Sequence, residues 1–460
     1  MKKSLVILFV SCLLSLCAGT LLAQPLPPAP KAHLTDLTKA GYFNEPAIAV
    51  NPANPQQLVV AWQVPASVAY STDGGQTWTV AQGTAPKDYR VSGDVSLAYD
   101  AAGHALLCYI AFDKLGSYNY WAQGATRNGI FVRRSLDGGK TWEAEAATVI
   151  AHNSDPGIPF EDKPWIVADT AGPHPGNLYI GWTQFTLAAS DLLFSRSTDG
   201  GKTWQRPIKL NSAPGLPRDD NGALEGFHGV VAPDGTLYVI WDDRDGIMMA
   251  VSHDGGATFS KDRRIINAGP GYFGITGVSR SNGFPQIGMD PRSGIEREKD
   301  LRGPAGKRGG NLYVSWSDYT NGDVDVFVAA SSDYGQTWSS PVRVNSDPLH
   351  NGHDQFFQWM AVDPKTGAVN VVFYDRRTDN KATTVTLARS TDGGKTFANY
   401  VLDNDAFAAE GDFLGDYLAV TAFGDKAFAA WAHQTQDEGT SERGKKTRTV
   451  LRVGSADFSF

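Results

Sequence analysis

The stretch STDGGQTW, from Ser71 to Trp78, decides the fold because close copies of it recur along the chain. The copies are SLDGGKTW from Ser135, STDGGKTW from Ser197, SHDGGATF from Ser252, SSDYGQTW from Ser331 and STDGGKTF from Ser390. An aspartate that accepts backbone N–H bonds, glycines that tolerate positive φ and a packed aromatic ring are typical of a tight turn between strands. The six copies predict a repeated all-β structure, in which each of these aspartates has a structural role.

Each copy lies within a longer unit, and residues 44–80 are the clearest example. This unit has an apolar run, a turn, a run with a tryptophan, a shorter run, the motif and a last short strand. Such a pattern is typical of a four-stranded meander. Runs that match the first two strands occur seven times, one more than the motif. A period of about 60 residues with four strands per unit is the signature of a β-propeller, with seven blades favoured and six as the alternative.

The seventh unit, which ends in TVLRVGSADFSF, lacks both the motif and a fourth strand. The segment HLTDL, which begins at His33, could supply that strand. The N-terminal part of the domain is therefore predicted to complete the last blade and close the ring.

The first 23 residues resemble a secretory signal, with two lysines, a short apolar run and a small residue at Ala23. A proline-rich linker at 24–32 and one propeller domain at 33–460 would follow. We therefore expect a secreted or periplasmic protein without a membrane span. The formal net charge of -8 provides no basic field for a phosphate backbone, so nucleic acid is not an expected partner.

In a propeller, ligands usually bind on the face where first strands begin and second strands end. This rim carries many carboxylates and arginines, which suit a carbohydrate or glycoconjugate. The insert that begins at Phe112 adds Trp121 as a candidate sugar platform. The candidate substrate-binding residues on the rim are His228, Gln358, Arg376, Arg377 and Asp416.

The repeat S-x-D-x-G-x-T-[WF] resembles the Asp-box, or BNR repeat, of the sialidase superfamily, and the resemblance extends over the whole mature chain. It implies three site residues. Glu225 in LEGFHGVVAPDG is placed like the family's glutamate, and Arg244 in LYVIWDDR like an arginine that binds the sugar carboxylate. Tyr417 in GDYLAV is placed like the nucleophilic tyrosine, which Glu225 would deprotonate.

Two features depart from the sialidase pattern. Asn44 stands where the family's first arginine is expected, and the segment QVPASVAYSTDGG has no carboxylate where the catalytic aspartate is expected. A glycosidase built on this chain would need another general acid, for which Asp94 and Asp162 are the candidates.

The sequence leaves two functions open. One is an exported, sialidase-like glycoside hydrolase that acts on a polar or acidic glycan, and the other is a non-catalytic propeller that binds glycan or protein at the cell surface. No cofactor or catalytic metal is expected. Structural calcium is an alternative at DDRDG from Asp242 and at NGDVD from Asn321, where oxygen ligands lie close in sequence.

Overall fold

The computed structural model describes residues 25–63, 66–81, 89, 91–113, 126–154, 158–269, 271–292, 310–409, 413–436 and 447–459. The predicted leader at 1–23 lies outside these residues. Within the described ranges, no helix is long and apolar enough to cross a membrane.

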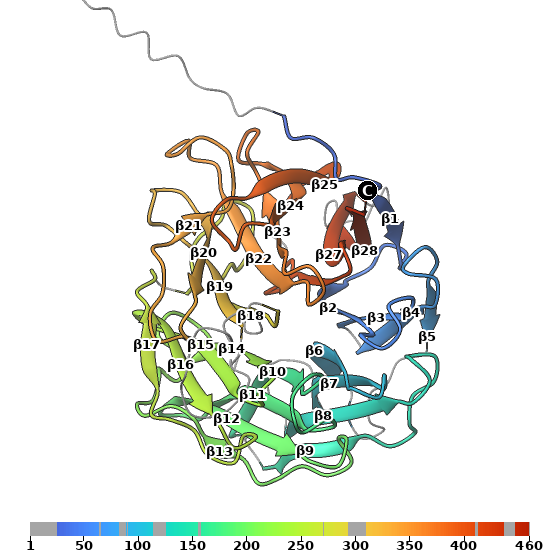
Figure 1. Cartoon of the computed structure of the whole chain (residues 1–460), viewed down its shortest axis with the longest axis vertical. Helices are drawn as coiled ribbons and strands as arrows, with labels where there is room; N and C mark the ends of the chain where they lie inside the picture. The colour runs from blue at the N-terminus through green and yellow to red at the C-terminus, as the bar shows by residue number, and fades with distance from the viewer. Residues whose placement is uncertain are drawn as a thin grey trace, which may run out of the picture.

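Seven four-stranded antiparallel sheets surround a central axis, as Figure 1 shows, so the prediction of a seven-bladed propeller is confirmed. Blade 1 contains β2 (Asn44–Val50), β3 (Leu58–Gln63), β4 (Ser67–Ser71) and β5 (Thr79–Ala81). Blade 2 contains β6 (Val91–Tyr99), β7 (Ala105–Phe112), β8 (Arg127–Ser135) and β9 (Ala147–Asn153). Blade 3 contains β10 (Phe160–Ala168), β11 (Leu178–Phe185), β12 (Ser190–Ser197) and β13 (Ile208–Lys209).

The remaining blades follow in chain order. Blade 4 contains β14 (Glu225–Val231), β15 (Leu237–Asp243), β16 (Gly246–Ser252) and β17 (Arg263–Ile266). Blade 5 contains β18 (Gln286–Asp290), β19 (Asn311–Asp318), β20 (Asp325–Ser331) and β21 (Val342–Arg343). Blade 6 contains β22 (Gln355–Val362), β23 (Val369–Asp375), β24 (Ala382–Ser390) and β25 (Ala398–Ala408).

Blade 7 joins the two ends of the domain. It contains β26 (Ala419–Phe423), β27 (Lys426–Gln436), β28 (Thr447–Asp457) and, on its outer edge, β1 (His33–Asp36). β1 pairs antiparallel with β28, with His33 opposite Ser455. Asp36 also forms an ion pair with Arg452, with Oδ1 2.6 Å from Nε. The predicted closure by the N-terminal segment is confirmed.

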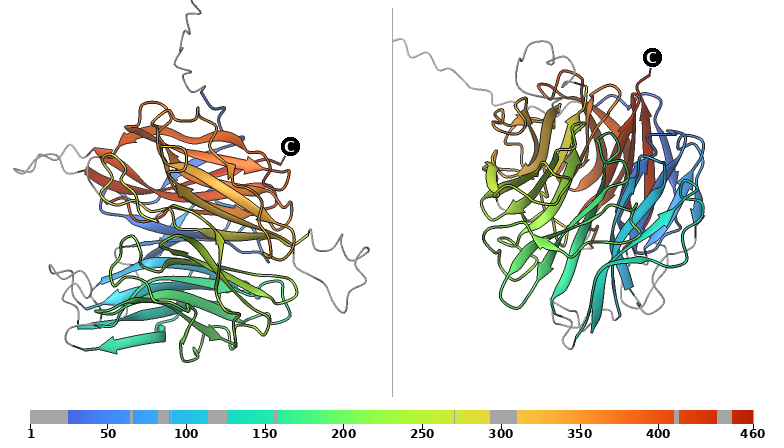
Figure 2. Two further views of the ribbon diagram at one scale, coloured as in Figure 1. Left: turned by 90° about the vertical axis from the view of Figure 1, so that its left-hand side faces the viewer. Right: turned by 60° about the horizontal axis from the view of Figure 1, so that its bottom comes forward.

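The core lies between neighbouring blades. The tryptophans of the second strands, Trp62, Trp182, Trp241, Trp316 and Trp431, are all buried. Because each sheet is apolar on both faces, it is stable only between two neighbours. The side views in Figure 2 show the sheets arranged next to one another, with their strands running roughly along the ring axis.

The Asp-box turns join third and fourth strands, as predicted. In the first turn, the Ser71 hydroxyl donates to Asp73 at 2.8 Å and accepts the Gly75 N–H at 2.9 Å. The Thr77 hydroxyl and N–H both donate to Asp73, and these bonds lower the pKa of Asp73 to about 2. The same pattern recurs in the other five motifs, so these aspartates are turn-forming residues.

The segment predicted as a linker contacts the propeller body. The Ala29 N–H donates to the carbonyl of Val401 at 2.9 Å, and the Val401 N–H donates to Pro27 at 2.9 Å. Ala29 is buried. These contacts hold the chain against the edge of blade 6 before it enters β1.

Candidate active site

First strands of five blades share a local distortion that shapes the channel mouth. In β2, β6, β10, β14 and β22, the pairing with the second strand shifts by a bulge near the strand start. The bulges contain residues with positive φ, namely Glu45, Asp94, Lys163, Gly226 and Phe357. Left-handed backbone is strained for residues other than glycine and is concentrated at functional sites. The repeated bulge marks this end of the channel as a candidate site.

A cavity of about 190 Å³ opens at this end of the channel. Its apolar lining consists of Ile110, Phe112, Phe160, Phe185, Phe284 and Phe413. Its polar lining consists of Glu45, Gln63, Asp94, Asp162, Lys163, Asp219, Glu225, Arg280 and Asp416. We call this cavity the acidic pocket. It contains four of the predicted site residues: Asp94, Asp162, Glu225 and Asp416.

Three carboxyl groups from blades 1 to 3 lie together in the acidic pocket. Burial, the charge of Asp94 and a hydrogen bond with Asp94 raise the pKa of Asp162 well above its usual value. Burial and Asp94 also raise the pKa of Glu45. Like charges in such close contact disfavour ionisation, so Glu45 and Asp162 hold a proton to higher pH than free carboxyl groups do. A retained proton is what a general acid needs.

Glu225, which lines the acidic pocket, accepts a short hydrogen bond from a tyrosine that is not itself among the described lining residues. The Tyr272 hydroxyl donates to Oε2 of Glu225 at 2.5 Å and also contacts Asp219. Burial and the charge of Asp219 raise the pKa of Glu225, which makes its carboxylate a stronger base toward the phenol.

Arg280 lies between two carboxylates of the acidic pocket. Its Nε donates to Oδ1 of Asp416 at 2.7 Å, and a second nitrogen pairs with the other oxygen of Asp416. The remaining terminal nitrogen pairs with Asp219. This guanidinium therefore holds together residues from three separate connections between blades.

The segment 267–285, between β17 and β18, carries both Tyr272 and Arg280, and two predicted substrate-binding residues brace it. Arg376 donates to the carbonyl of Thr276 at 2.6 Å, and Gln358 donates to the carbonyl of Phe284 at 2.9 Å. Both side chains are buried. The structure thus places Arg376 and Gln358 behind the segment rather than in the acidic pocket, where they position Tyr272 and Arg280.

Tyr417, the predicted nucleophile, lies below the acidic pocket. Its hydroxyl donates to the carbonyl of Val95 at 3.4 Å, and its ring packs against Trp165 and Trp359. Asp416, the residue before it, is the one that lines the acidic pocket. The structure therefore pairs Glu225 with Tyr272 instead of Tyr417.

Lys163 separates the acidic pocket from this aromatic layer. Its Nζ lies 3.8 Å from the centre of the Tyr417 ring and 4.8 Å from that of Phe284. Burial lowers the pKa of Lys163, although Asp416, Asp94 and Glu45 oppose this effect. Lys163 is thus a buried basic group next to the carboxyl groups, and its Nζ has no hydrogen-bond partner among the described atoms.

The other predicted binding residues lie away from the acidic pocket. Arg244 is exposed in the turn between β15 and β16. The ring of His228 packs against Trp165, with centroids 5.2 Å apart, and lines a separate apolar cavity toward the Asp-box face. Arg377 is bound by Asp375 at 2.7 Å. Trp121 lies outside the described residues.

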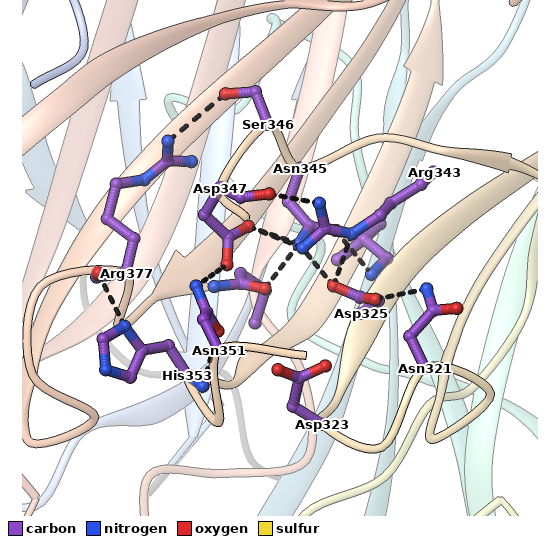
Figure 3. Close-up of polar contacts among 12 residues, drawn as sticks. Asn321, Asp323, Asp325, Arg343, Asn345, Ser346, Asp347, Asn351, His353 and Arg377 are labelled. Atoms are coloured by element: carbon purple, nitrogen blue, oxygen red, sulfur yellow. Dashed lines mark hydrogen bonds and ion pairs between the residues drawn. The ribbon is translucent and has the colours of Figure 1, made fainter. Parts of the chain in front are cut away.

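Figure 3 shows the network to which Arg377 belongs, which includes part of the segment considered for calcium. Oδ1 of Asp325 accepts from Arg343 at 2.7 Å and from Asn345 at 2.6 Å. Asn321 donates to Oδ2 of Asp325 at 2.6 Å. In the described part of the chain, no group of three or more His, Cys, Asp or Glu residues is arranged to hold a metal. Structural calcium stays a prediction.

Sequence reasoning missed Asp219, Tyr272 and Arg280, which lie in the connections from blade 3 to 4 and from blade 4 to 5. These two connections do not recur from blade to blade. The position of a residue relative to the Asp-box therefore gives no indication that Asp219, Tyr272 or Arg280 lies at the site. The segment 267–285 is, however, the longest connection between consecutive blades, and it ends at the rim. The length of this connection was therefore the sequence feature that could have pointed to Tyr272 and Arg280.

A family model described as "BNR/Asp-box repeat" matches residues 69–80 and 195–206. These matches fall on the turns described above, and seven sheets close the ring. The chain is a seven-bladed β-propeller that carries Asp-box repeats. No curated protein matches the sequence of this Asp-box propeller.

Solved structures resemble the Asp-box propeller at low sequence identity. A Hadza microbial sialidase, Hz136, is 16% identical with a TM-score of 0.49, over 87% of this chain and 73% of the other. The NanB sialidase from Streptococcus pneumoniae is 12% identical with a TM-score of 0.46, over 95% and 70%. An α-L-arabinofuranosidase of Fusarium graminearum is 14% identical with a TM-score of 0.45, over 76% and 92%.

Proposed function

We propose that this Asp-box propeller is an exported glycoside hydrolase that acts on a polar glycan by a retaining mechanism. The observation that carries the proposal is the short hydrogen bond between Tyr272 and Glu225. Glu225 lines the acidic pocket together with Asp162, whose pKa is raised by burial and by Asp94. A nucleophile next to a base, and a protonated acid in the same pocket, are the groups that such a reaction needs.

In the first step, the Tyr272 oxygen attacks the anomeric carbon while its proton passes to Glu225. The glycosidic C–O bond breaks, and Asp162 donates a proton to the leaving oxygen, assisted by its hydrogen bond with Asp94. The product is a glycosyl–tyrosine intermediate.

In the second step, water attacks the anomeric carbon and gives its proton to the carboxylate left on Asp162. The bond to Tyr272 breaks, and Glu225 returns the proton to the phenolic oxygen. Two inversions at one carbon give net retention. The aromatic side chains that line the acidic pocket would pack on the C–H faces of the sugar ring.

The test is a panel of aryl glycosides, including the sialic acid glycoside, incubated with the purified full chain. We expect release of the aryl alcohol from at least one member and formation of the retained anomer first, observed by NMR. An inverted first product would contradict a tyrosine nucleophile. Glycan binding without turnover across the panel would instead favour the non-catalytic binding propeller.

A further inference from the structure

The acidic side chains that line the acidic pocket outnumber the basic ones. Among its described lining residues, six are carboxylic acids, at positions 45, 94, 162, 219, 225 and 416, and two are cations, Lys163 and Arg280. Burial and neighbouring carboxyl groups raise the pKa of Glu45, Asp162 and Glu225.

The two cations of the acidic pocket differ in their partners: Arg280 is paired with carboxylates, whereas Nζ of Lys163 has no hydrogen-bond partner among the described atoms. All three guanidinium nitrogens of Arg280 already bond to Asp416 and Asp219. Lys163 is buried, and its Nζ lies over the rings of Tyr417 and Phe284. A ligand carboxylate would still meet six carboxyl groups against these two cations.

Glu45 shows which kind of ligand group the acidic pocket lacks. Glu45 lines the acidic pocket, and only 2% of its surface is exposed. Its Oε2 has no hydrogen-bond partner among the described atoms. Gly415 lies close to this glutamate: a Cβ added to Gly415 would be 2.8 Å from Cγ of Glu45. This close contact limits how far the Glu45 side chain can move. A buried acceptor without a donor is costly, and a ligand that supplies the donor gains accordingly.

We propose that the acidic pocket binds a sugar with a free, positively charged amino group, recognised by Glu45 with Asp94. An ammonium group supplies three N–H donors and one positive charge, which match an unpartnered oxygen and an excess of carboxylates. The proposal rests on the proposed function for the sugar class, whereas the amine follows from the charges alone.

A metal ion is the other cation that carboxylates could attract. The described residues contain no group of three or more carboxylates, histidines or cysteines with metal-site geometry. Organic ammonium needs only hydrogen-bond geometry, and the phenylalanines around the acidic pocket suit the apolar faces of a sugar ring. We therefore commit to the amine.

The test measures binding by titration calorimetry at pH 7 with EDTA present, using the full-length Tyr272→Phe variant so that turnover does not interfere. The probes are glucosamine, galactosamine and mannosamine, each compared with its N-acetyl counterpart, and glucuronic acid. We expect at least one amine to bind roughly tenfold or more tightly than its N-acetyl counterpart, because a charge-assisted bond is lost on acetylation. Glu45→Gln should remove this preference. Glu145→Gln should keep it, since Glu145 is exposed and is not among the residues that line the acidic pocket.

Several outcomes would overturn the proposal. They are equal or tighter binding of the N-acetyl sugars, tightest binding of glucuronic acid, no binding of any amine, or binding that requires added calcium. Failure of this proposal is distinguishable from failure of the proposed function. Turnover of aryl glycosides without amine preference rejects only the amine, and amine preference without any turnover rejects only the hydrolase.

Discussion

The Tyr272 hydroxyl donates to Glu225 at 2.5 Å across 47 positions of sequence, from the connection before blade 5 to the first strand of blade 4. The two residues lie in different parts of the repeated unit, Glu225 at the start of a first strand and Tyr272 in a connection between blades. The contact exists because Arg376 and Gln358 fold the segment 267–285 back over the channel mouth. Predictions on activity and on stability follow from this arrangement.

Asp162→Asn should stabilise the protein at pH 8 while abolishing most turnover. The folded-state pKa of Asp162 is raised above its unfolded value. The acid therefore favours folding while protonated, and this contribution is lost as pH rises from about 4 toward the folded-state pKa. Asparagine does not ionise and avoids that loss. Urea denaturation should show a gain of about 1 kcal/mol or more at pH 8 and little change at pH 4. A loss of stability at pH 8 would contradict the assigned pKa direction.

Arg280→Met should destabilise the fold at pH 8 by about 2–4 kcal/mol, because it leaves Asp416 and Asp219 without their shared partner. The pKa of Asp416 is already raised to about 6, chiefly by burial. At pH 5 the carboxyl is largely protonated, so the loss should be smaller there. Denaturation curves at the two pH values measure the difference. An equal loss at both would show that packing, not charge, is responsible.

Removing residues up to Asp36 should open the ring. Without β1, the edge of β28 is exposed and can pair with other molecules. We expect a lower melting temperature and aggregation, measured by differential scanning fluorimetry and light scattering. Asp36→Asn is the control, since the partly exposed pair with Arg452 should contribute about 1 kcal/mol or less. An unchanged melting temperature after truncation would refute closure by β1.

Trp78→Ala should reduce stability without affecting ligand binding. The ring is half-buried against the core that blades 1 and 7 share. Full burial of tryptophan would correspond to about 3–5 kcal/mol on truncation, so we expect about 2 kcal/mol. Chemical denaturation and the calorimetric assay above measure the two effects. Lost binding with unchanged stability would place Trp78 in the site instead.

The fold was largely predictable from sequence, and the site only in part. Six Asp-boxes and seven pairs of strand runs gave the blade count and the closure, because each blade repeats the same burial pattern. Asp94, Asp162, Glu225 and Asp416 could be found because they stand at the starts of first strands or just before them. Tyr272 and Arg280 could not, since their connection has no repeat and its path depends on tertiary bonds. Tyr417 directly follows Asp416, yet Asp416 lines the acidic pocket while the Tyr417 ring packs against Trp165 and Trp359, a difference that depends on tertiary packing.

The central claim is that Tyr272 is the nucleophile, and turnover of the best aryl glycoside by Tyr272→Phe and Tyr417→Phe tests it most directly. Both variants lose only a hydroxyl oxygen from a buried or partly buried tyrosine in the same region. We expect kcat to fall by a factor of about 10³ or more in Tyr272→Phe, and to remain close to that of the unmodified protein in Tyr417→Phe. Undiminished turnover by Tyr272→Phe, or loss confined to Tyr417→Phe, would contradict the claim.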